Sequence, residues 1–318
     1  MPWDKWYHGV AHDRKRCVTT NADLLLAVGA VGLAAGFIGS MLGIGGGIFL
    51  VPLFSVVLGI PLKIAIATSL VAVVATAAAG ANVYLRQGLA DVRLAMLLEI
   101  PTVLGAISGG LLASVLDADV LSLIFVALAF YTAWNMVRRH AGRKPEISNT
   151  QGGPPGNGLA AGSDEGVKEA SVRAGAGWVR EYFDVREGRM VRYRVERLGV
   201  GMLVSVLGGM ASGLLGIGGG IIKVPVMALA MRVPMRAAVA TSNFMVGITA
   251  AASAMVYFAG GLVDPLIAAT AALAVLVGAN LGARTASRVD QKLLSWIFAL
   301  LLGVLALQML VQAVGGAA

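Results

Sequence analysis

Ten apolar runs, separated by short polar or glycine-rich stretches, dominate the hydrophobicity pattern of this chain. In the first half they are Asp23–Leu42, Ile48–Gly59, Leu62–Leu85, Leu94–Leu116 and Val120–Val137. In the second half they are Leu198–Leu215, Ile221–Met231, Ala237–Phe258, Pro265–Ala283 and Leu293–Val314. Eight of these runs approach or exceed the ~20 residues with which a helix crosses a bilayer. The other two, Ile48–Gly59 and Ile221–Met231, are too short to do so, and each follows a Gly-Ile-Gly-Gly-Gly sequence.

One constant offset relates the two halves of the pattern. The stretches Gly36–Pro52 and Gly209–Pro225 read almost the same, and they start 209 − 36 = 173 residues apart. The offset also pairs Pro61 with Pro234, Ala67-Thr68-Ser69 with Ala240-Thr241-Ser242, and Gly105 and Gly109 with Gly278 and Gly282. We interpret the chain as a duplication. The paired glycines four residues apart predict close helix packing in lipid rather than a binding site.

These features predict an all-α polytopic membrane protein with about eight transmembrane helices in two four-helix repeats. After each glycine break, a half-helix or re-entrant piece is expected to run to Pro61 or Pro234. Non-helical backbone at membrane depth is tolerated only where protein buries it or where it lines a watery cavity. Two breaks at matching positions of two halves therefore indicate a transport site.

Composition supports the membrane class. The chain is 58% hydrophobic and 13% charged, with 42 glycines and a mean hydropathy of +0.81, which leaves too little charge to cover a soluble globule. The net charge of +8 does not indicate nucleic-acid binding, because most of the 25 basic residues are outside the apolar runs: four precede the first run and twelve lie between Arg138 and Arg197. The positive-inside rule predicts that the N-terminus and the central connector are both cytoplasmic.

The number of crossings per half decides how the repeats are related. A cytoplasmic N-terminus with a cytoplasmic connector requires four crossings per half and parallel repeats. If the two short segments also cross, each half has five crossings, the repeats are inverted, and the connector lies outside. Arg284, Arg288 and Lys292 argue against four crossings, because that arrangement places their turn outside. The sequence leaves both arrangements open.

The chain divides into four regions: an N-terminal segment (1–22), a first transmembrane repeat (23–137), the connector (138–197) and a second repeat (198–318). Within the connector, 142–166 is rich in Gly and Pro and is expected to be flexible. Two stretches between 178 and 196 alternate apolar and charged residues around Glu187-Gly188, which predicts a small β-hairpin.

The glycine breaks also suggest chemistry. A helix that starts at Gly45–Gly47 or Gly218–Gly220 presents free N–H groups and a positive dipole end, which favour an anion. Lys223 follows Gly220 by three residues inside an apolar run, where a lysine either serves function or snorkels toward the headgroups. The candidate substrate-binding residues are the glycines of both breaks and nearby polar residues: Gly43, Gly45, Gly46, Gly47, Thr68, Ser69, Gly216, Gly218, Gly219, Gly220, Lys223, Thr241, Ser242 and Asn243. The hydroxyls among them could equally cap helices or bond to their own helix.

The paired Gly-x-x-x-Gly/Ser-x-Leu-Gly-Ile-Gly-Gly-Gly-x-x-x-Val-Pro motifs, each followed by Ala-Thr-Ser, resemble the sulfite exporter TauE/SafE family of membrane permeases. The resemblance covers both apolar halves. It implies a bacterial-type inner-membrane permease for small anions, with sulfite, sulfoacetate and related organosulfonates among the family's substrates. Because the family is broad in substrate, the resemblance does not name the cargo.

Glu99 is the one carboxylate well inside an apolar run. It is a candidate for proton coupling, since burial disfavours its charged form, or it pairs with Arg93 near the surface. The histidines (His8, His12 and His140) and Cys17 lie outside the apolar runs, so no metal site or cofactor is expected.

The sequence therefore predicts a secondary transporter, not an enzyme, that moves a small anionic substrate across the lipid bilayer by alternating access around the two breaks. The alternatives are a membrane-embedded enzyme and a scaffold that uses the connector to hold partners. Which anion is carried, its direction, its coupling ion and the oligomeric state do not follow from the sequence.

Overall fold

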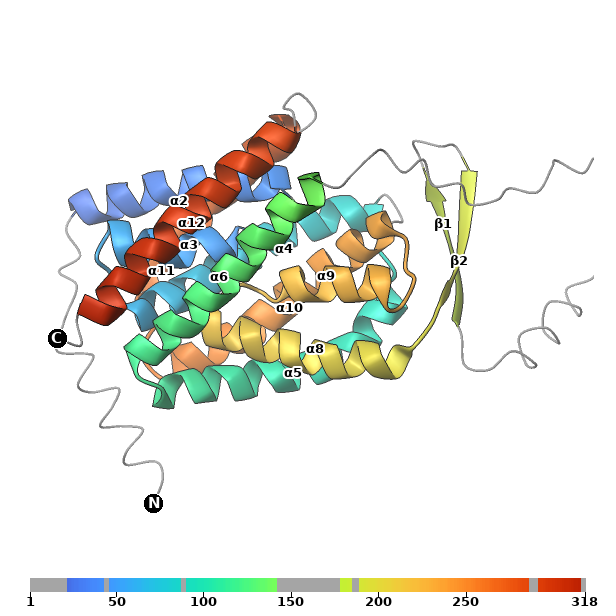
Figure 1. The fold of residues 1–318 in the computed structure, drawn as a ribbon, viewed down its shortest axis with the longest axis horizontal. Helices are drawn as coiled ribbons and strands as arrows, with labels where there is room; N and C mark the ends of the chain where they lie inside the picture. Colours follow the sequence, from blue (N-terminus) through green and yellow to red (C-terminus); the bar gives the residue numbers. More distant parts are fainter. Residues whose placement is uncertain are drawn as a thin grey trace, which may run out of the picture.

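The structure, a computed structural model, describes residues 22–42, 46–86, 90–141, 178–184, 189–285 and 291–315. It is a helix bundle with one two-stranded sheet beyond one end (Figure 1). The elements of the first half are α2 (Ala22–Leu42), α3 (Gly47–Pro52), the π-helix η1 (Leu53–Val57), α4 (Leu62–Arg86), α5 (Val92–Val115) and α6 (Ala118–Ala141). They are followed by β1 (Trp178–Asp184), β2 (Arg189–Val195), α8 (Leu198–Leu215), α9 (Gly220–Leu229), α10 (Met235–Ala259), α11 (Pro265–Thr285) and α12 (Gln291–Gly315).

Equivalent helices of the two halves begin the same number of residues apart as the repeated sequence motifs. Helices α4 and α10 each have 25 residues and begin at Leu62 and Met235, which are 235 − 62 = 173 residues apart. The short helices α3 and α9 begin at Gly47 and Gly220, again 220 − 47 = 173 residues apart.

The two short apolar runs form short helices, as predicted. Helix α9 has 10 residues and, at 1.5 Å per residue, is about 15 Å long, half the thickness of a bilayer core. Helix α3 has six residues and ends at Pro52, after which the chain continues as η1 with a bond from the Leu58 N–H to the Leu53 carbonyl. The equivalent Pro225 lies inside α9, which continues as an α-helix to Leu229.

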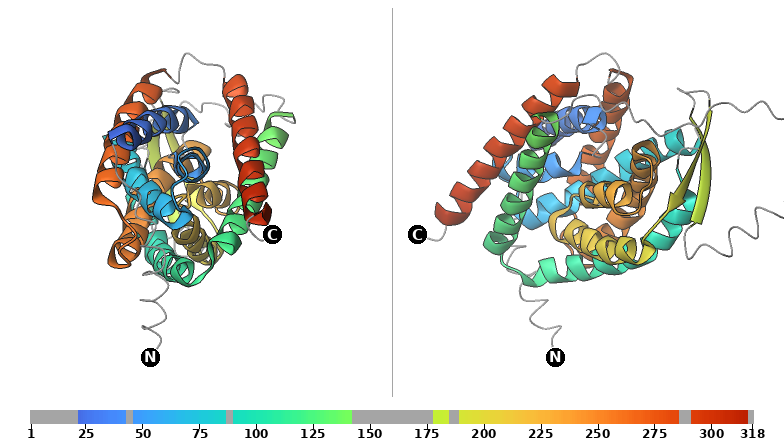
Figure 2. Two further views of the ribbon diagram at one scale, coloured as in Figure 1. Left: turned by 90° about the vertical axis from the view of Figure 1, so that its left-hand side faces the viewer. Right: turned by 45° about the vertical axis from the view of Figure 1, so that its right-hand side comes forward.

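The first long helix of each half packs on the third long helix of the other half. Helix α2 lies against α11 and α8 lies against α5, while α4 contacts α10 and α6 contacts α12. Figure 2 shows α2 with α11 on one side of the bundle and α6 with α12 on the other. The two halves are therefore interleaved, so that each buries its apolar surface against the other.

Glycines bring these helices into backbone contact. A Cβ on Gly105 would overlap the Val206 carbonyl oxygen, and one on Gly278 would overlap the carbonyl oxygen of Leu33. Gly109 and Gly282 make the equivalent contacts one turn further along, with the carbonyls of Met210 and Phe37. The prediction that these four glycines form packing surface is confirmed.

The same contacts fix the helix directions. Along α5 and α8, Gly105 meets Val206 and Gly109 meets Met210, so the two helices run parallel. Along α2 and α11, Leu33 meets Gly278 and Phe37 meets Gly282, so these two are also parallel.

The bundle has a connector end and an opposite end. At the connector end, β2 joins the start of α5 and the α9–α10 turn: the Tyr193 hydroxyl donates to Asp91 Oδ2 (3.2 Å) and the Glu196 N–H donates to the Met231 carbonyl (3.1 Å). Helix α10 starts at this end, α11 returns to it, and α2 runs parallel to α11. The start of α2 therefore lies at the opposite end, and α2 and α8 run in opposite directions.

This arrangement corrects the sequence-based topology. The prediction that the N-terminal part and the connector lie on the same side is wrong for the start of α2, which is at the other end of the bundle from β1 and β2 (Figure 1). The reason is that each glycine break and short helix brings the chain back to the end from which the preceding long helix came. Residues 1–21 themselves lie outside the described residues.

Six described helices are long and apolar enough to cross a membrane: α2, α4, α5, α8, α10 and α11. Many of their exposed side chains are apolar, with Leu26, Leu203 and Leu273 among them. A bundle with this exterior needs lipid around it, because in water a large apolar surface would be exposed to solvent.

Strands β1 and β2 pair antiparallel, from Trp178 opposite Val195 to Asp184 opposite Arg189. They fall within the stretches for which the sequence predicts a hairpin, while the turn between them, residues 185–188, and the flexible region 142–166 lie outside the described residues. The base of the sheet is anchored, because Val195 is buried in an apolar cluster with Leu94, Leu98 and Met231.

Candidate functional site

Each short helix is preceded by a glycine whose backbone is in the left-handed conformation. The residues that precede α3 and α9 are Gly46 (φ 73°) and Gly219 (φ 71°). A side chain would strain this backbone, which is why glycine occupies both positions. The prediction that helices start at the two breaks is confirmed, although Gly43 and Gly45 lie outside the described residues.

The two breaks meet inside the bundle. Ser69 Oγ lies 3.0 Å from the Gly216 carbonyl oxygen and 3.3 Å from that of Gly47, and either can accept its proton. A Cβ on Gly47 would come within 2.9 Å of the Gly216 carbonyl oxygen. Ser69 therefore joins the first break to the second.

Two buried hydroxyls without a hydrogen-bond partner lie at the start of α9. Ser242 Oγ is 3.5 Å from the position of a Cβ on Gly220, and Ser212 Cβ is 3.5 Å from that of a Cβ on Gly219. Neither hydroxyl has a partner within the described part of the chain, and both side chains are almost fully buried. A buried hydroxyl without a partner costs free energy, so this pair indicates a place where a ligand or water supplies the missing bond.

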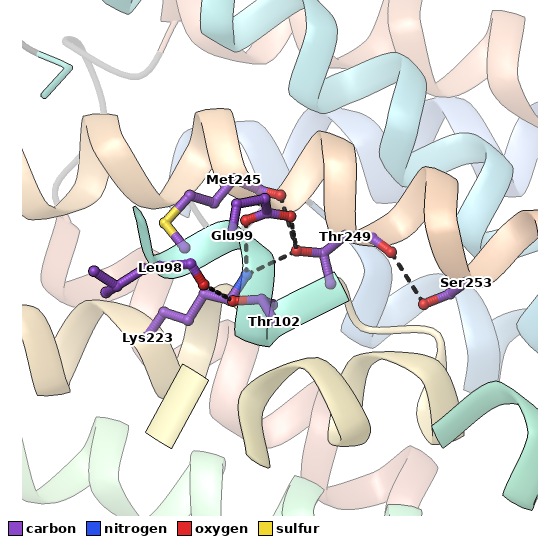
Figure 3. A network of polar contacts seen from close by, with 7 residues as sticks. All are labelled: Leu98, Glu99, Thr102, Lys223, Met245, Thr249 and Ser253. Atoms are coloured by element: carbon purple, nitrogen blue, oxygen red, sulfur yellow. Dashed lines mark hydrogen bonds and ion pairs between the residues drawn. The ribbon is translucent and has the colours of Figure 1, made fainter. Parts of the chain in front are cut away.

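A buried ion pair lies one turn further along α9. Lys223 Nζ is 3.8 Å from Glu99 Oε2, and the two residues are 2% and 6% exposed. Lys223 comes from α9 and Glu99 from α5, so the pair joins the two halves of the chain (Figure 3). Two opposite charges at this depth stabilise one another, since either alone would be costly to bury.

Thr249 of α10 lies between the two charges. Lys223 Nζ donates to Thr249 Oγ1 (2.8 Å), and the Thr249 hydroxyl is 2.7 Å from Glu99 Oε1 and 2.9 Å from the Met245 carbonyl oxygen (Figure 3). The second carboxylate oxygen, Glu99 Oε2, accepts no hydrogen bond from the described residues. One hydroxyl thus bridges the pair, and Glu99 Oε2 faces the ammonium at 3.8 Å without a hydrogen bond from the described residues.

The charged cluster has no counterpart at the pseudo-equivalent positions. The 173-residue offset places Leu50 at the position of Lys223, Ala272 at that of Glu99 and Thr76 at that of Thr249. Thr76 donates to the carbonyl of Val73 in its own helix (2.9 Å). The two halves therefore provide similar scaffolds, and only the second break has charges beside it.

Two sequence-based alternatives are wrong. Lys223 does not snorkel toward a surface, because its side chain is buried and paired. Glu99 pairs with Lys223 and not with the exposed Arg93. Neither outcome follows from local sequence, because the partners come from different halves.

The remaining predicted residues are spread over the helix interfaces. Thr241 Oγ1 accepts a bond from the Asp91 N–H (3.0 Å), which ties α10 to the start of α5. Asn243 Nδ2 lies 3.5 Å from the Ala77 carbonyl oxygen of α4. Thr68 is buried, and its hydroxyl has no partner among the described residues. Of the predicted polar residues, Ser242 and Lys223 lie at the start of α9, and Ser69 contacts the Gly216 carbonyl just before it.

Sequence reasoning missed Ser212 and Thr249. A signal for Thr249 exists, because Ser242, Thr249 and Ser253 lie seven and four residues apart and so share one face of α10. Within the described residues, no three His, Cys, Asp or Glu side chains gather to hold a metal ion. The site can therefore offer hydroxyls, N–H groups and one ammonium to an anion, and one carboxylate to a proton.

One family profile and two bacterial proteins are similar to this chain over most of its length. The profile of the family described as "Sulfite exporter TauE/SafE" matches residues 28–309. "Probable membrane transporter protein YunE" of Bacillus subtilis (strain 168) is 24% identical over 270 residues, covering 83% of this chain and 87% of that protein. A "Probable membrane transporter protein" of Xylella fastidiosa (strain 9a5c) is 28% identical over 285 residues, covering 89% and 93%. No solved structure shows significant similarity to the chain.

Proposed function

We propose that this chain, which belongs to the sulfite exporter TauE/SafE family, is a secondary permease that carries small anions across the membrane. Two relatives named as probable membrane transporters cover most of its length, which supports transport rather than catalysis or scaffolding. We further propose which class of anion is carried and where in the structure it binds.

The observation that carries the proposal is the group of donors at the start of α9. The unpartnered hydroxyls of Ser212 and Ser242 lie beside this helix end, and the Lys223 side chain is one turn into the helix. A helix N-terminus carries a partial positive charge, and a desolvated ammonium adds a full one. Together they provide several donors for one small anion.

Sulfur oxyanions and organosulfonates such as sulfite or sulfoacetate fit this arrangement. Their several oxygens can accept from the two hydroxyls, the backbone and the ammonium at once. Gly218, Gly219 and Gly220 are closely packed in this structure, because a Cβ on each would lie within 3.1 Å of Val246 or of the Gly208 carbonyl oxygen. In the first half, Gly46, Gly47, Thr68 and Ser69 form the matching break, which we propose moves with the second during transport.

The site is closed in this structure. Leu94, Leu98, Met227 and Met245 form part of an apolar cluster near the connector end, and a second apolar cluster surrounds the first break. We propose alternating access, in which the packing on one side of the breaks loosens while the other stays closed.

The proposed topology places the connector end in the cytoplasm. Helices α6 and α12 have 24 and 25 residues, long enough to cross with the six more apolar helices, which makes eight crossing helices in inverted repeats. Basic residues gather at this end: Arg86, Arg93, Arg194, Arg197, Arg232, Arg236, Arg284 and Lys292. Among the described residues Lys63 is the basic residue at the opposite end. The positive-inside rule therefore favours this orientation in an inner membrane.

The test is thermal stabilisation of the purified protein by a panel of anions: sulfite, thiosulfate, sulfate, sulfoacetate, methanesulfonate, taurine and simple carboxylates. A ligand that binds the folded state raises the melting temperature by mass action. We expect a selective rise that is lost in Lys223→Ala and kept in Lys63→Ala, which removes the same charge from the Ser114 carbonyl at the far end of the bundle.

Uptake of the stabilising anion into proteoliposomes then distinguishes transport from binding alone. If no anion raises the melting temperature, or if both lysine variants lose the rise equally, the result would contradict an anion site at the second break.

A further inference from the structure

The charge balance of the buried pair links anion binding to a second ligand. This inference rests on the proposed anion permease and concerns the same site. Lys223 and Glu99 together have no net charge, and their pseudo-equivalents Leu50 and Ala272 are apolar. An anion that joined the ionised pair would leave one uncompensated negative charge in a buried site. Uncompensated charge at this depth is strongly unfavourable.

No other charged group in the described surroundings can provide the compensation. Helix α8, which packs along α5, has no charged residue, and α9 has Lys223 alone. On α10 the titratable residues are Arg236, 13 residues from Thr249 (249 − 236) and so about 20 Å away along the helix, and Tyr257. The Tyr257 hydroxyl donates to the Gly213 carbonyl (2.9 Å). Arg93 and Asp91 lie at the exposed start of α5.

We propose that the site binds a monovalent anion together with one proton, and that Glu99 is the proton site. The proton passes from water to Glu99 Oε2, the carboxylate oxygen that accepts no hydrogen bond from the described residues. Lys223 stays an ammonium. The charges of Lys223, neutral Glu99 and a monovalent anion again add up to zero, so binding of the anion and the proton leaves the net buried charge unchanged.

Thr249 connects the proton site, Glu99, with the ammonium of Lys223. In the empty site its hydroxyl accepts from Lys223 and faces Glu99 Oε1. Once Glu99 is neutral, the ammonium loses its counter-charge and turns to the anion. A dianion such as thiosulfate would still leave one negative charge, so the site favours a monovalent anion, or a dianion in its singly protonated form.

The experiment measures proton uptake directly. The purified wild-type protein in weak buffer with a pH indicator is titrated with methanesulfonate, whose own charge stays fixed at minus one near neutral pH. We expect close to one proton taken up per anion bound, and an affinity that rises about tenfold for each unit by which the pH falls while free Glu99 is ionised. In Glu99→Gln, anion binding should continue without proton uptake and without this pH dependence.

Proteoliposomes provide the second readout. A pH gradient should drive methanesulfonate uptake by the wild type and should have no effect on uptake by Glu99→Gln. Thiosulfate should bind more weakly than methanesulfonate in the wild type, and tighter thiosulfate binding would overturn the preference for a monovalent anion.

The chain offers its own folding control. The double variant Lys223→Leu/Glu99→Ala installs the residues that occupy the equivalent positions of the first half, so it removes both charges without leaving one unpaired. It should fold, bind no anion and take up no proton.

The outcomes separate the two proposals. Anion binding by the wild type without proton uptake, or proton uptake that persists in Glu99→Gln, overturns the coupling and leaves the permease standing. Absence of binding and transport for every anion overturns both. If Glu99→Gln does not fold, the wild-type titration alone still decides.

Discussion

At the scale of single residues, the glycines between α5 and α8 set how closely the halves approach. A Cβ on Gly105 would overlap the Val206 carbonyl oxygen, and the backbones are thus in direct contact there. In lipid, where apolar side chains gain little from avoiding their surroundings, such close van der Waals contact is a main source of association. These positions therefore tolerate no side chain, although they bear no chemistry.

We predict that Gly105→Ala lowers the free energy of unfolding by about 1–3 kcal/mol, because the added methyl group forces the two helices apart. Thermal or denaturant unfolding in detergent measures the change. Gly303→Ala is the matched control, since nothing lies within 4 Å of the added Cβ. It should be neutral or stabilising by up to about 1 kcal/mol through helix propensity. Equal effects at both positions would contradict the packing role.

At the scale of elements, the two-stranded sheet is tied to the helices that carry the charged pair. Tyr193 of β2 bonds to Asp91 at the start of α5, the helix of Glu99, and Glu196 bonds to Met231 after α9, the helix of Lys223. An exposed ion pair between Arg232 and Glu196 (3.3 Å) lies beside them. Motion of the connector and motion around the site are therefore mechanically linked.

We predict that Tyr193→Phe weakens this attachment by about 1 kcal/mol, the usual net contribution of one hydrogen bond. Hydrogen exchange of residues 189–196 and of the first turn of α5 should become faster. Arg232→Ala is the comparison, because an exposed ion pair contributes little. Faster exchange in Arg232→Ala but not in Tyr193→Phe would show that the attachment depends on the surface pair instead.

At the scale of the whole molecule, each half covers apolar surface of the other. The first half uses α2 to cover α11, and the second uses α8 to cover α5, so each half completes the other. The antiparallel course of α2 and α8 follows from this exchange. It also places most described basic residues at one end, which resolves the conflict that Arg284 and Lys292 pose for parallel repeats.

We predict opposite accessibility of the two ends in the membrane. In a Cys17→Ser background, Asp117→Cys at the opposite end should react with a membrane-impermeant maleimide in intact cells. Arg232→Cys at the connector end should react only after permeabilisation. Both residues are exposed, so reactivity reports the side of the membrane and not burial. Labelling of both from the same side would contradict the inverted arrangement.

The sequence by itself determined the helices and their repetition. The apolar runs predict the long helices, and each short run after a glycine break predicts a short one, because helix formation and its interruption depend on neighbouring residues. The start of α9 at Gly220 and the packing role of Gly105 follow from composition and spacing that are visible in the chain.

Only the tertiary structure decided the course of the chain and the partners within the site. Lys223 and Glu99 are 223 − 99 = 124 residues apart, and each looks like an isolated buried charge until α9 and α5 are placed together. The end of the bundle at which the sheet lies relative to the start of α2 depends on whether a short helix turns back or stops, which a few residues do not specify. Both are settled by packing between the halves, where the costs of buried charge and of unfilled space are shared by residues far apart in sequence.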